Sequence, residues 1–264
     1  MPLYQVDAFT ITPFRGNPAG VWIGERFPDK TVMQAIAAEM NLSETAFVEC
    51  DDGGYAIRYF TPACEIPLCG HATLASAHIL RELEAIRDGV PFVLKASEQD
   101  LPIVVDNGWI TMTFPRHRIA KIDNPHFLEA LVGSPVVEAF KNEKNWIVAR
   151  LADEGALRGA CPDFPAIQKN NVGMFIAATT PSSLPEYEYC VRVFCNPDYG
   201  MLEDPVTGTA QCVLAPYWHA ELKKTAFFSR QISQRGGEMK VNLLADAVEI
   251  KGQAVTVFAL EARI

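Results

Sequence analysis

Hydrophobic and polar residues alternate over short stretches of the chain, as is typical of β-strands separated by turns. These stretches include residues 19–23, 45–50 and 55–61 in the first half, and 239–244, 247–250 and 254–260 near the end. A helical spacing interrupts the alternation at residues 30–40, where five apolar side chains share one face: Val32, Met33, Ile36, Ala37 and Met40. Asp106-Asn-Gly108 predicts a hairpin between two further strands, and turns are expected at 15–18 and 51–54.

One local pattern occurs twice. Arg58-Tyr-Phe60 precedes Gly70-His-Ala72, and Arg192-Val-Phe194 precedes Gly208-Thr-Ala210. Apolar residues at three- and four-residue spacing follow each glycine, which predicts helices from Gly70 to about Ile86 and from Gly208 to about Leu222. Pro216 lies inside the second helix and is expected to kink or shorten it. The two arginines are expected to pair with charges beneath the sheet.

The repeat predicts an α+β fold of two pseudo-symmetric domains, each a strongly bent sheet with one central helix. The first domain is expected to cover residues 1–115 and the second 116–264, although the last strand could return to the first domain. The pattern of residues 115–180 is more ambiguous. A short helix is expected at 125–132, and strands are expected at 145–151 and 172–178. Unpaired N–H groups and the dipole at each helix start favour an anion such as a carboxylate.

Composition and charge exclude several classes of function. The 264 residues are 49% hydrophobic and carry a net charge of -9, and no basic patch suited to nucleic acid or an anionic membrane is evident. The sequence lacks an apolar run long enough to span a membrane, and its start does not resemble a signal peptide. We therefore expect a cytoplasmic protein whose seven cysteines are free thiols.

Six motifs occur in a fixed order: VDAFT, FRGNPAG, SETAFV, RYFTP, CGHAT and EDPVTGTA. Together they resemble the family of the phenazine-biosynthesis isomerase, which has the diaminopimelate-epimerase-like fold. The resemblance covers both halves of the chain. It implies two domains, each a barrel-like, mostly antiparallel sheet around a central helix, with the active site in the cleft between them. It also implies a homodimer that needs no cofactor.

The resemblance also implies roles for individual residues. Glu44 matches the catalytic acid/base, and His71 and Asp204 match partners that bind the substrate or the glutamate. The expected substrate-binding residues are Asn17, Cys69, Gly70, Gly208 and Thr209.

These groups suit a proton shift in a small unsaturated carboxylic acid. One carboxyl group can remove a proton from one carbon and return it to another on the same face, which moves a double bond without metal or nucleotide. Glu44 would have to be desolvated enough to exchange its proton near neutral pH, and Leu42, Ala46 and Phe47 are expected to supply that setting.

Three alternatives remain open from the residues alone. A two-base racemase would use a pair of thiols, but the repeat places Thr207 opposite Cys69, and threonine is a poor acid or base. The protein could instead bind a small acid without converting it. Glu44 could also be an ordinary solvated carboxylate.

No metal or nucleotide cofactor is expected. Cys64 and Cys69, like Cys190 and Cys195, have a spacing found in zinc knuckles. The second pair, however, lies along a predicted strand, where a separation of five residues directs the side chains to opposite faces. No nucleotide-binding loop and no hydrolase motif is present.

Overall fold

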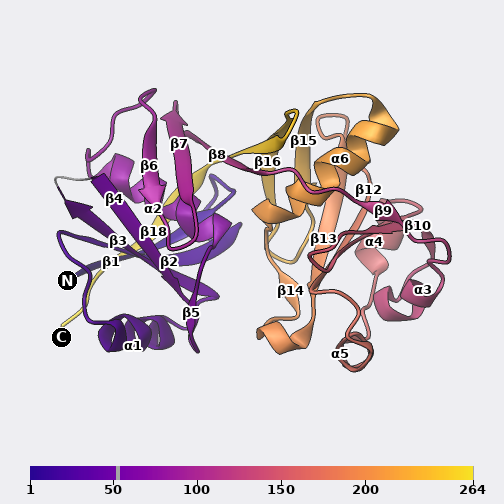
Figure 1. Cartoon of the computed structure of the whole chain (residues 1–264), viewed down its shortest axis with the longest axis horizontal. Coiled ribbons are helices and arrows are strands. Elements are labelled where there is room, and N and C mark those ends of the chain that lie inside the picture. Colours follow the sequence, from indigo (N-terminus) through magenta and orange to yellow (C-terminus); the bar gives the residue numbers. More distant parts are fainter. Residues whose placement is uncertain (52–53, 264) are drawn as a thin grey trace. The chain divides into compact units, whose positions relative to one another are not determined.

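The computed structural model describes residues 1–51 and 54–263, which form two compact units (Figure 1). Unit 1 contains residues 1–113 and the C-terminal segment from Lys251, and unit 2 contains Phe114–Ile250. The sequence placed one boundary near Pro115 and left open a return of the last strand. The turn expected at 51–54 includes residues 52 and 53, which lie outside the described residues.

Unit 1 is built mainly of strands. Its helices are α1 (Lys30–Met40) and α2 (Gly70–Glu82). Its strands are β1 (Pro2–Ala8), β2 (Asn17–Gly24), β3 (Glu44–Asp51), β4 (Gly54–Phe60), β5 (Glu65–Ile66), β6 (Phe92–Lys95), β7 (Asp100–Asp106), β8 (Trp109–Pro115, which runs on into unit 2) and β18 (Ala254–Glu261).

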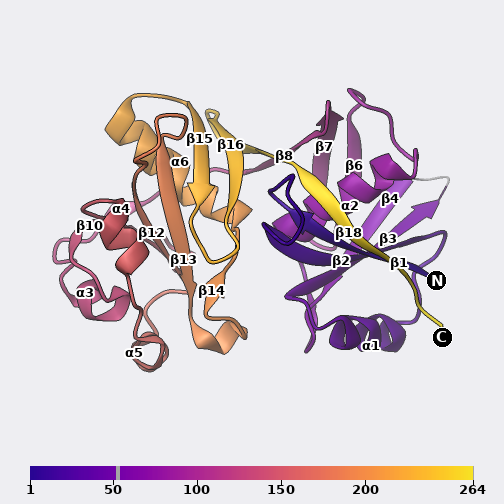
Figure 2. The same cartoon turned by 180° about the vertical axis from the view of Figure 1, so that it is seen from behind.

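The sheet of unit 1 runs in the order β18-β1-β2-β3-β4-β6-β7-β8, with short β5 beside β4. The pairs β2–β3 and β4–β6 are parallel and the others are antiparallel. Figures 1 and 2 both show β18 beside β1, which explains why the chain's end belongs to unit 1. The predicted hairpin is confirmed: Asp106 pairs with Trp109, and Asn107 and Gly108 both have positive φ.

Helix α2 forms the centre of unit 1. Ten of its thirteen residues are buried, including Leu74, Ala75 and Ile79, so nearly every side of the helix faces the core. The helix ends at Glu82 rather than near Ile86, because Glu84 has a φ of 57° and the Ala85 N–H turns back to the Leu80 carbonyl. The prediction of its start is confirmed and that of its end is wrong.

Unit 2 contains more short elements. Its helices are α3 (Phe127–Val132), α4 (Glu154–Gly159), α5 (Phe164–Asn170) and α6 (Gln211–Leu222), with the 3-10 turns η1 (Pro197–Tyr199) and η2 (Gly208–Ala210). Its strands are β9 (Ala120–Lys121), β10 (Val136–Lys141), β11 (Trp146–Leu151), β12 (Phe175–Pro181), β13 (Tyr189–Cys195), β14 (Glu203–Asp204), β15 (Ala226–Gln231), β16 (Gly237–Leu243) and β17 (Ala247–Gly252, which ends in unit 1).

The sheet of unit 2 repeats the strand order of unit 1. Strand β11 pairs in parallel with β12, β12 antiparallel with β13, β13 in parallel with β15, and β15 antiparallel with β16. The same alternation relates β2, β3, β4, β6 and β7 in unit 1. With α2 and α6 at equivalent places, the α+β class and the two similar halves are confirmed.

The repeated arginines hold equivalent ion pairs. Arg58 donates to both carboxylate oxygens of Glu65 at 2.7 and 2.9 Å, and Arg192 does the same with Glu203 at 2.9 and 2.8 Å. Each guanidinium also lies over the ring of the phenylalanine two residues further along its strand, 5.4 Å from the Phe60 centroid and 4.8 Å from that of Phe194. The expected structural pairing is confirmed. The four extra residues of the second copy fall around η1.

Pro216 does not shorten α6, which continues to Leu222. Proline has no N–H, so the Cys212 carbonyl one turn earlier loses its usual partner. The backbone N–H of His117 donates to that carbonyl at 3.0 Å. A neighbouring segment of unit 2 therefore supplies the hydrogen bond that the Cys212 carbonyl loses because residue 216 is proline.

Within the described residues, we find no helix with both the length and the apolar character needed to cross a membrane.

Replacing Arg192 by alanine should lower the free energy of unfolding by about 3 kcal/mol, because it leaves Glu203 with an unpaired, partly buried charge. Its guanidinium also binds the carbonyls of Leu157 and Ala160. Arg81→Ala is the matched control, since Arg81 pairs with Asp88 in solvent, where both side chains are 40% exposed. That change should cost less than about 1 kcal/mol. Equal losses in urea unfolding would contradict the structural role of the repeated pair.

Candidate active site

The starts of β2 and β3 place two expected site residues at one edge of unit 1. The strands are parallel and Ala19 pairs with Glu44, so the beginnings of both strands meet at the same edge. Asn41 adopts a left-handed conformation after α1 and turns the chain toward β3. Glu44, the first residue of β3, is 9% exposed, and Asn17, the first of β2, is fully buried. The reading of Glu44 as a solvated surface carboxylate is wrong.

The start of α2 contributes the second part of the site. Cys69 is the N-cap residue, and both the N–H and the hydroxyl of Thr73 donate to its carbonyl. The N–H groups of Gly70, His71 and Ala72 precede this first intrahelical bond. They are the backbone donors that a helix start offers to an anion.

His71 joins these parts. Its Nε2 lies 3.2 Å from Oε2 of Glu44 and 3.4 Å from Oγ of Ser43. Its Nδ1 lies 3.4 Å from Sγ of Cys69. Glu44, Cys69 and His71 are all buried. The imidazole is therefore held between a carboxylate on one nitrogen and a thiol on the other.

The pKa shifts describe an ion pair. Burial raises the pKa of Glu44, but the charge and hydrogen bond of His71, with hydrogen bonds to Ser43 and Cys69, outweigh it and hold the pKa below its ordinary value. Burial lowers the pKa of His71, but Cys69 and Glu44 raise it well above its ordinary value. Burial and the nearby Glu44 raise the pKa of the Cys69 thiol. Because that thiol stays protonated, the negative charge that stabilises the imidazolium is that of Glu44.

This differs from the sequence-based expectation in one respect. Glu44 is desolvated as expected, but its pKa moves down rather than up, because the adjacent His71 outweighs the effect of burial. The free protein thus holds Glu44 as a carboxylate, the form that accepts a proton.

Glu44, Cys69 and His71 also offer three donor atoms within 4.8 Å of one another, a spacing that could suit a metal ion. A transition metal would need Cys69 as a thiolate and His71 as a neutral imidazole. The raised pKa of the thiol and the raised pKa of the imidazole both oppose those forms. A metal bound at this cluster would therefore have to displace a proton from both groups.

Asp204 lies in a separate polar network of unit 2. The hydroxyl of Thr207 donates to Oδ2 of Asp204 at 2.6 Å. The Gln231 amide nitrogen donates to the Asp204 carbonyl at 2.6 Å, while its Oε1 accepts from the Thr207 N–H at 2.9 Å. All three residues are buried. Asp204 lies in β14, paired with Val193 of β13, and the side chains of Thr207 and Gln231 add hydrogen bonds to its carboxylate and its carbonyl.

The second helix start differs slightly from the first. Gly208 opens the 3-10 turn η2, which leads directly into α6, so the α-helix itself begins at Gln211 rather than at Gly208. Thr207 is the N-cap of this turn, as Cys69 is of α2. Gly208 is buried and Thr209 is half-buried.

The structure brings together the expected residues in two groups. Unit 1 holds Glu44, Cys69, Gly70 and His71 around one imidazole and Asn17 at the same strand edge, while unit 2 holds Asp204, Gly208 and Thr209 around the start of η2. Sequence reasoning assigned no role to Ser43, Thr207 or Gln231. The first two stand inside quoted motifs and could have been singled out, whereas Gln231 is distant in sequence and has no local signal.

Comparison with known proteins gives consistent matches. The family model described as phenazine biosynthesis-like protein matches residues 6–259. A Halalkalibacterium halodurans protein named an uncharacterized isomerase is 40% identical over 262 residues, covering 98% of this chain and 97% of its own length. Phenazine biosynthesis-like domain-containing protein 2 of Mus musculus is 38% identical over 287 residues, covering 97% of each chain.

A solved structure matches over the same extent. The crystal structure of an Enterococcus faecalis phenazine biosynthesis protein of the PhzF family superposes with a TM-score of 0.93 at 34% identity. The match covers 100% of this chain and 99% of that one.

The ion pair predicts a distinct titration of His71. Its imidazole should stay protonated well above pH 6.5, the ordinary value for histidine, and Glu44→Gln should lower its pKa because the neutral amide removes the opposing charge. NMR titration of the five histidine side chains measures both effects. The signal of His126, which pairs with Glu129 on the surface, should not respond to the substitution. An unchanged His71 titration would contradict the ion pair.

The same shifts predict how stability depends on pH. The raised pKa of His71 contributes stability that is present below 6.5 and is lost as pH rises through the folded value. The lowered pKa of Glu44 contributes stability that is present above 4.5 and is lost as pH falls through the folded value. Glu44→Gln should therefore be most destabilising between these two pH values, as urea unfolding across that range would measure.

Proposed function

This chain belongs to the family of phenazine biosynthesis-like proteins, and we propose that it is an isomerase that moves a proton and a double bond within a small unsaturated carboxylic acid. Glu44 serves as the single acid/base, and no cofactor takes part. The buried contact between Glu44 and His71 is the observation that carries this proposal, because it keeps a desolvated carboxylate ready to accept a proton.

The chemical step conserves all atoms of the substrate. The Glu44 carboxylate takes a proton from a carbon next to the double bond, and the electron pair of that C–H bond shifts into a conjugated anion. The same carboxyl group then returns the proton to another carbon on the same face, which leaves the double bond in its new position. The ion pair between Nε2 of His71 and Glu44 tunes how readily the carboxyl group keeps or releases the proton.

The helix start of α2 suits the carboxylate of such a substrate. The dipole places about half a positive charge there, and the imidazolium of His71 neutralises the charge of Glu44. A second carboxylate can then bind without net repulsion, and the helix N–H groups of Gly70 and its neighbours can stabilise charge that develops during the step. The family resemblance also assigns Asn17, Asp204, Gly208 and Thr209 to substrate binding, and they are kept in that role as part of the proposal.

A single carboxyl group explains the site better than a pair of thiols. Cys69 is buried and the pKa of its thiol is raised. Its sulfur lies 3.4 Å from Nδ1 of His71. Its counterpart in unit 2 is Thr207, whose hydroxyl is occupied by Asp204. We assign Cys69 to positioning His71, with Nδ1 toward sulfur and Nε2 toward Glu44.

The buried Glu44 carboxylate does not favour a protein that only binds small acids. Burying an ionised carboxylate costs several kcal/mol unless a partner offsets the cost, and a pure binder would bind an anion more tightly without Glu44. A homodimer remains part of the proposal on the family resemblance, and sedimentation of the purified protein measures the oligomeric state. The cytoplasmic location expected from the sequence also remains a proposal.

Glu44→Gln should lower turnover by about 10²- to 10⁴-fold, the usual contribution of a general acid/base. The experiment incubates candidate unsaturated acids with the protein in deuterated water. NMR follows the shift of the double bond, and mass spectrometry follows uptake of deuterium at the receiving carbon. Cys69→Ala is the matched control and should retain activity within about tenfold, since it removes no proton carrier.

Three results would decide between the alternatives. Full activity in Glu44→Gln would remove Glu44 from its role. Loss of activity in Cys69→Ala with retention in Glu44→Gln would favour thiol chemistry. Binding of acids, seen as a thermal shift, without any double-bond movement or label uptake would favour a binding protein.

Thr207→Val should lower kcat/KM by about tenfold or more, since the loss of one hydrogen bond to a charged group costs about 1.5–3 kcal/mol. The side chain keeps its shape but no longer donates to Asp204. Thr207→Ser keeps the hydroxyl and should restore activity. Unchanged activity in the valine variant, with a correctly folded protein by circular dichroism, would show that Asp204 needs no orientation by Thr207.

A further inference from the structure

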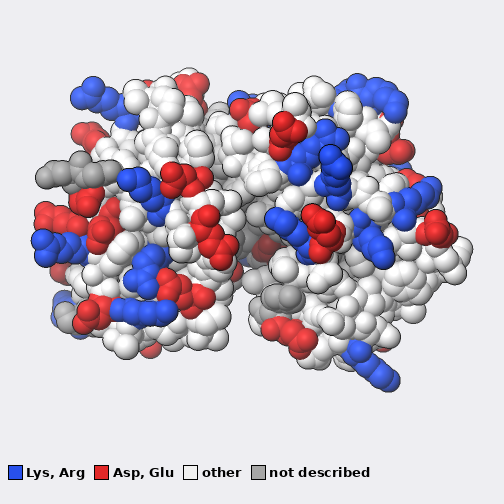
Figure 3. All heavy atoms as spheres, viewed as in Figure 1, with Lys and Arg blue, Asp and Glu red and all other residues white. Residues whose placement is uncertain are grey.

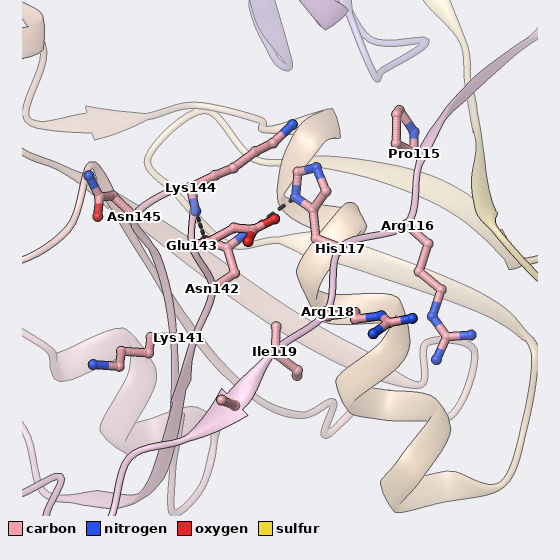
Figure 4. A pocket seen from close by; sticks show the side chains of 11 residues that line it. Pro115, Arg116, His117, Arg118, Ile119, Lys141, Asn142, Glu143, Lys144 and Asn145 are labelled. Carbon is pink, nitrogen blue, oxygen red and sulfur yellow. Dashed lines mark hydrogen bonds between the residues drawn. The ribbon is translucent and has the colours of Figure 1, made fainter.

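Unit 2 contains a pocket that takes no part in the proposed reaction. Two segments, 115–120 and 141–145, enclose a cavity of about 740 Å³, a size typical of small-molecule sites. Figure 4 shows the side chains that line it, with His117 lying between the two segments. Its charged or titratable lining residues, here called the basic pocket, are Arg116, His117, Arg118, Lys141, Glu143 and Lys144.

The basic pocket gathers four cations in a chain whose net charge is -9. Acidic residues outnumber Lys and Arg by 32 to 23 in the chain as a whole. Among the residues that the structure describes, Arg116, Arg118, Lys141 and Lys144 form no ion pair with a carboxylate. Figure 3 shows Lys and Arg side chains gathered over the segment that joins β8 to β9. Four unpaired cations around one cavity leave it with a local positive charge inside an acidic protein.

The positive charge of Lys144 acts on the pKa values of two neighbouring groups. Burial and the charge of Lys144 lower the pKa of His117, and Glu143 offsets only part of this effect. The same lysine acts to lower the pKa of the Cys212 thiol, although burial raises it overall. The cations around this cavity repel one another and disfavour protonation of His117. A bound anion would reduce that repulsion.

The frame of the pocket is held in place by hydrogen bonds. Oδ1 of Asn142 accepts from the N–H groups of Lys144 and Trp146. The Asn142 amide nitrogen therefore faces Nδ1 of His117, at 3.3 Å, and donates to it. This leaves the His117 proton on Nε2 as a donor toward a ligand. The His117 backbone is itself anchored to Cys212 of α6, so the two segments are fixed before any ligand arrives.

We infer that the basic pocket binds a small anion with two or more negative charges, in the form of a phosphate or a polycarboxylate. Arg116 and Arg118 present planar guanidinium groups suited to bidentate contact with phosphate or carboxylate oxygens. Lys141 and Lys144 add point charges from the other segment. None of the proposed catalytic residues lines this pocket.

The test measures binding of pyrophosphate and of citrate by calorimetry and by the NMR signals of His117, with acetate as the monovalent comparison at constant ionic strength. We expect saturable binding of one multivalent anion per chain, with a shift of the His117 signals, and no comparable binding of acetate. Affinity should fall as ionic strength rises. Pyrophosphate binding with no citrate binding would identify a phosphate site, and the reverse a polycarboxylate site.

Two neutralising variants and one control locate the site. Arg118→Gln and Lys144→Gln should each weaken binding by about tenfold or more, since each removes a charged hydrogen-bond donor. Lys169→Gln removes an exposed lysine of the same unit outside the pocket and should leave affinity unchanged. The variants alter exposed side chains, and unchanged melting temperatures would verify their folding.

Failure to bind either multivalent anion would overturn the inference, as would binding that survives both pocket substitutions or falls equally in the Lys169→Gln control. The measurements are also made in the Glu44→Gln protein. Anion binding that persists there, whatever the outcome for isomerase activity, separates this inference from the proposed function.

Discussion

The contact between the Glu44 carboxylate and the His71 imidazole constrains the rest of the site, because both groups are buried. An unpaired carboxylate in such a place would cost several kcal/mol. The pairing therefore requires the start of β3 and the start of α2 to meet, which the parallel β2–β3 pair and the central position of α2 achieve. The helix dipole favours the negative partner and disfavours the positive one. A substrate carboxylate at the same helix start would restore that balance, so the charges of the free site already favour an acidic ligand.

The two units share a scaffold but not this chemistry. The pairing of β12 with β13 places Ala178 opposite Arg192, as the pairing of β3 with β4 places Phe47 opposite Arg58. Counting back three residues along each strand makes Phe175 the counterpart of Glu44. By the repeated glycines, Thr209 is the counterpart of His71. Unit 2 thus keeps the arginine ion pair and the helix start but has no matching acid/base, and it supplies Asp204 where unit 1 has Ile66. Such asymmetry within a duplicated fold suits one proton carrier better than two.

Local patterns predicted much of this structure because their causes are local. Helix 30–40, the Asp106–Gly108 hairpin and the two helix starts depend on spacing, turn residues and glycine, all visible in the sequence. The end of α2 escaped prediction because Leu83 and Ile86 continue the helical spacing while the chain turns at Glu84. The direction of the Glu44 pKa shift and the role of Gln231 were not predicted either. Both depend on contacts between residues 24 to 27 positions apart, which are set by sheet and helix packing rather than by spacing.

Pro216, a proline inside a helix, is linked to a tertiary hydrogen bond. A proline inside a helix normally costs about 3 kcal/mol, partly because a carbonyl one turn earlier loses its donor. Here that carbonyl, of Cys212, accepts from the backbone of His117, so the missing helical bond is replaced by one from the segment that lines the basic pocket. Any other residue at 216 would bring an N–H that competes for the same carbonyl. The proline therefore leaves an acceptor open for His117, and the His117 side chain is in turn aligned by Asn142. The missing helical hydrogen bond and the anchoring of the His117 backbone therefore have a common cause.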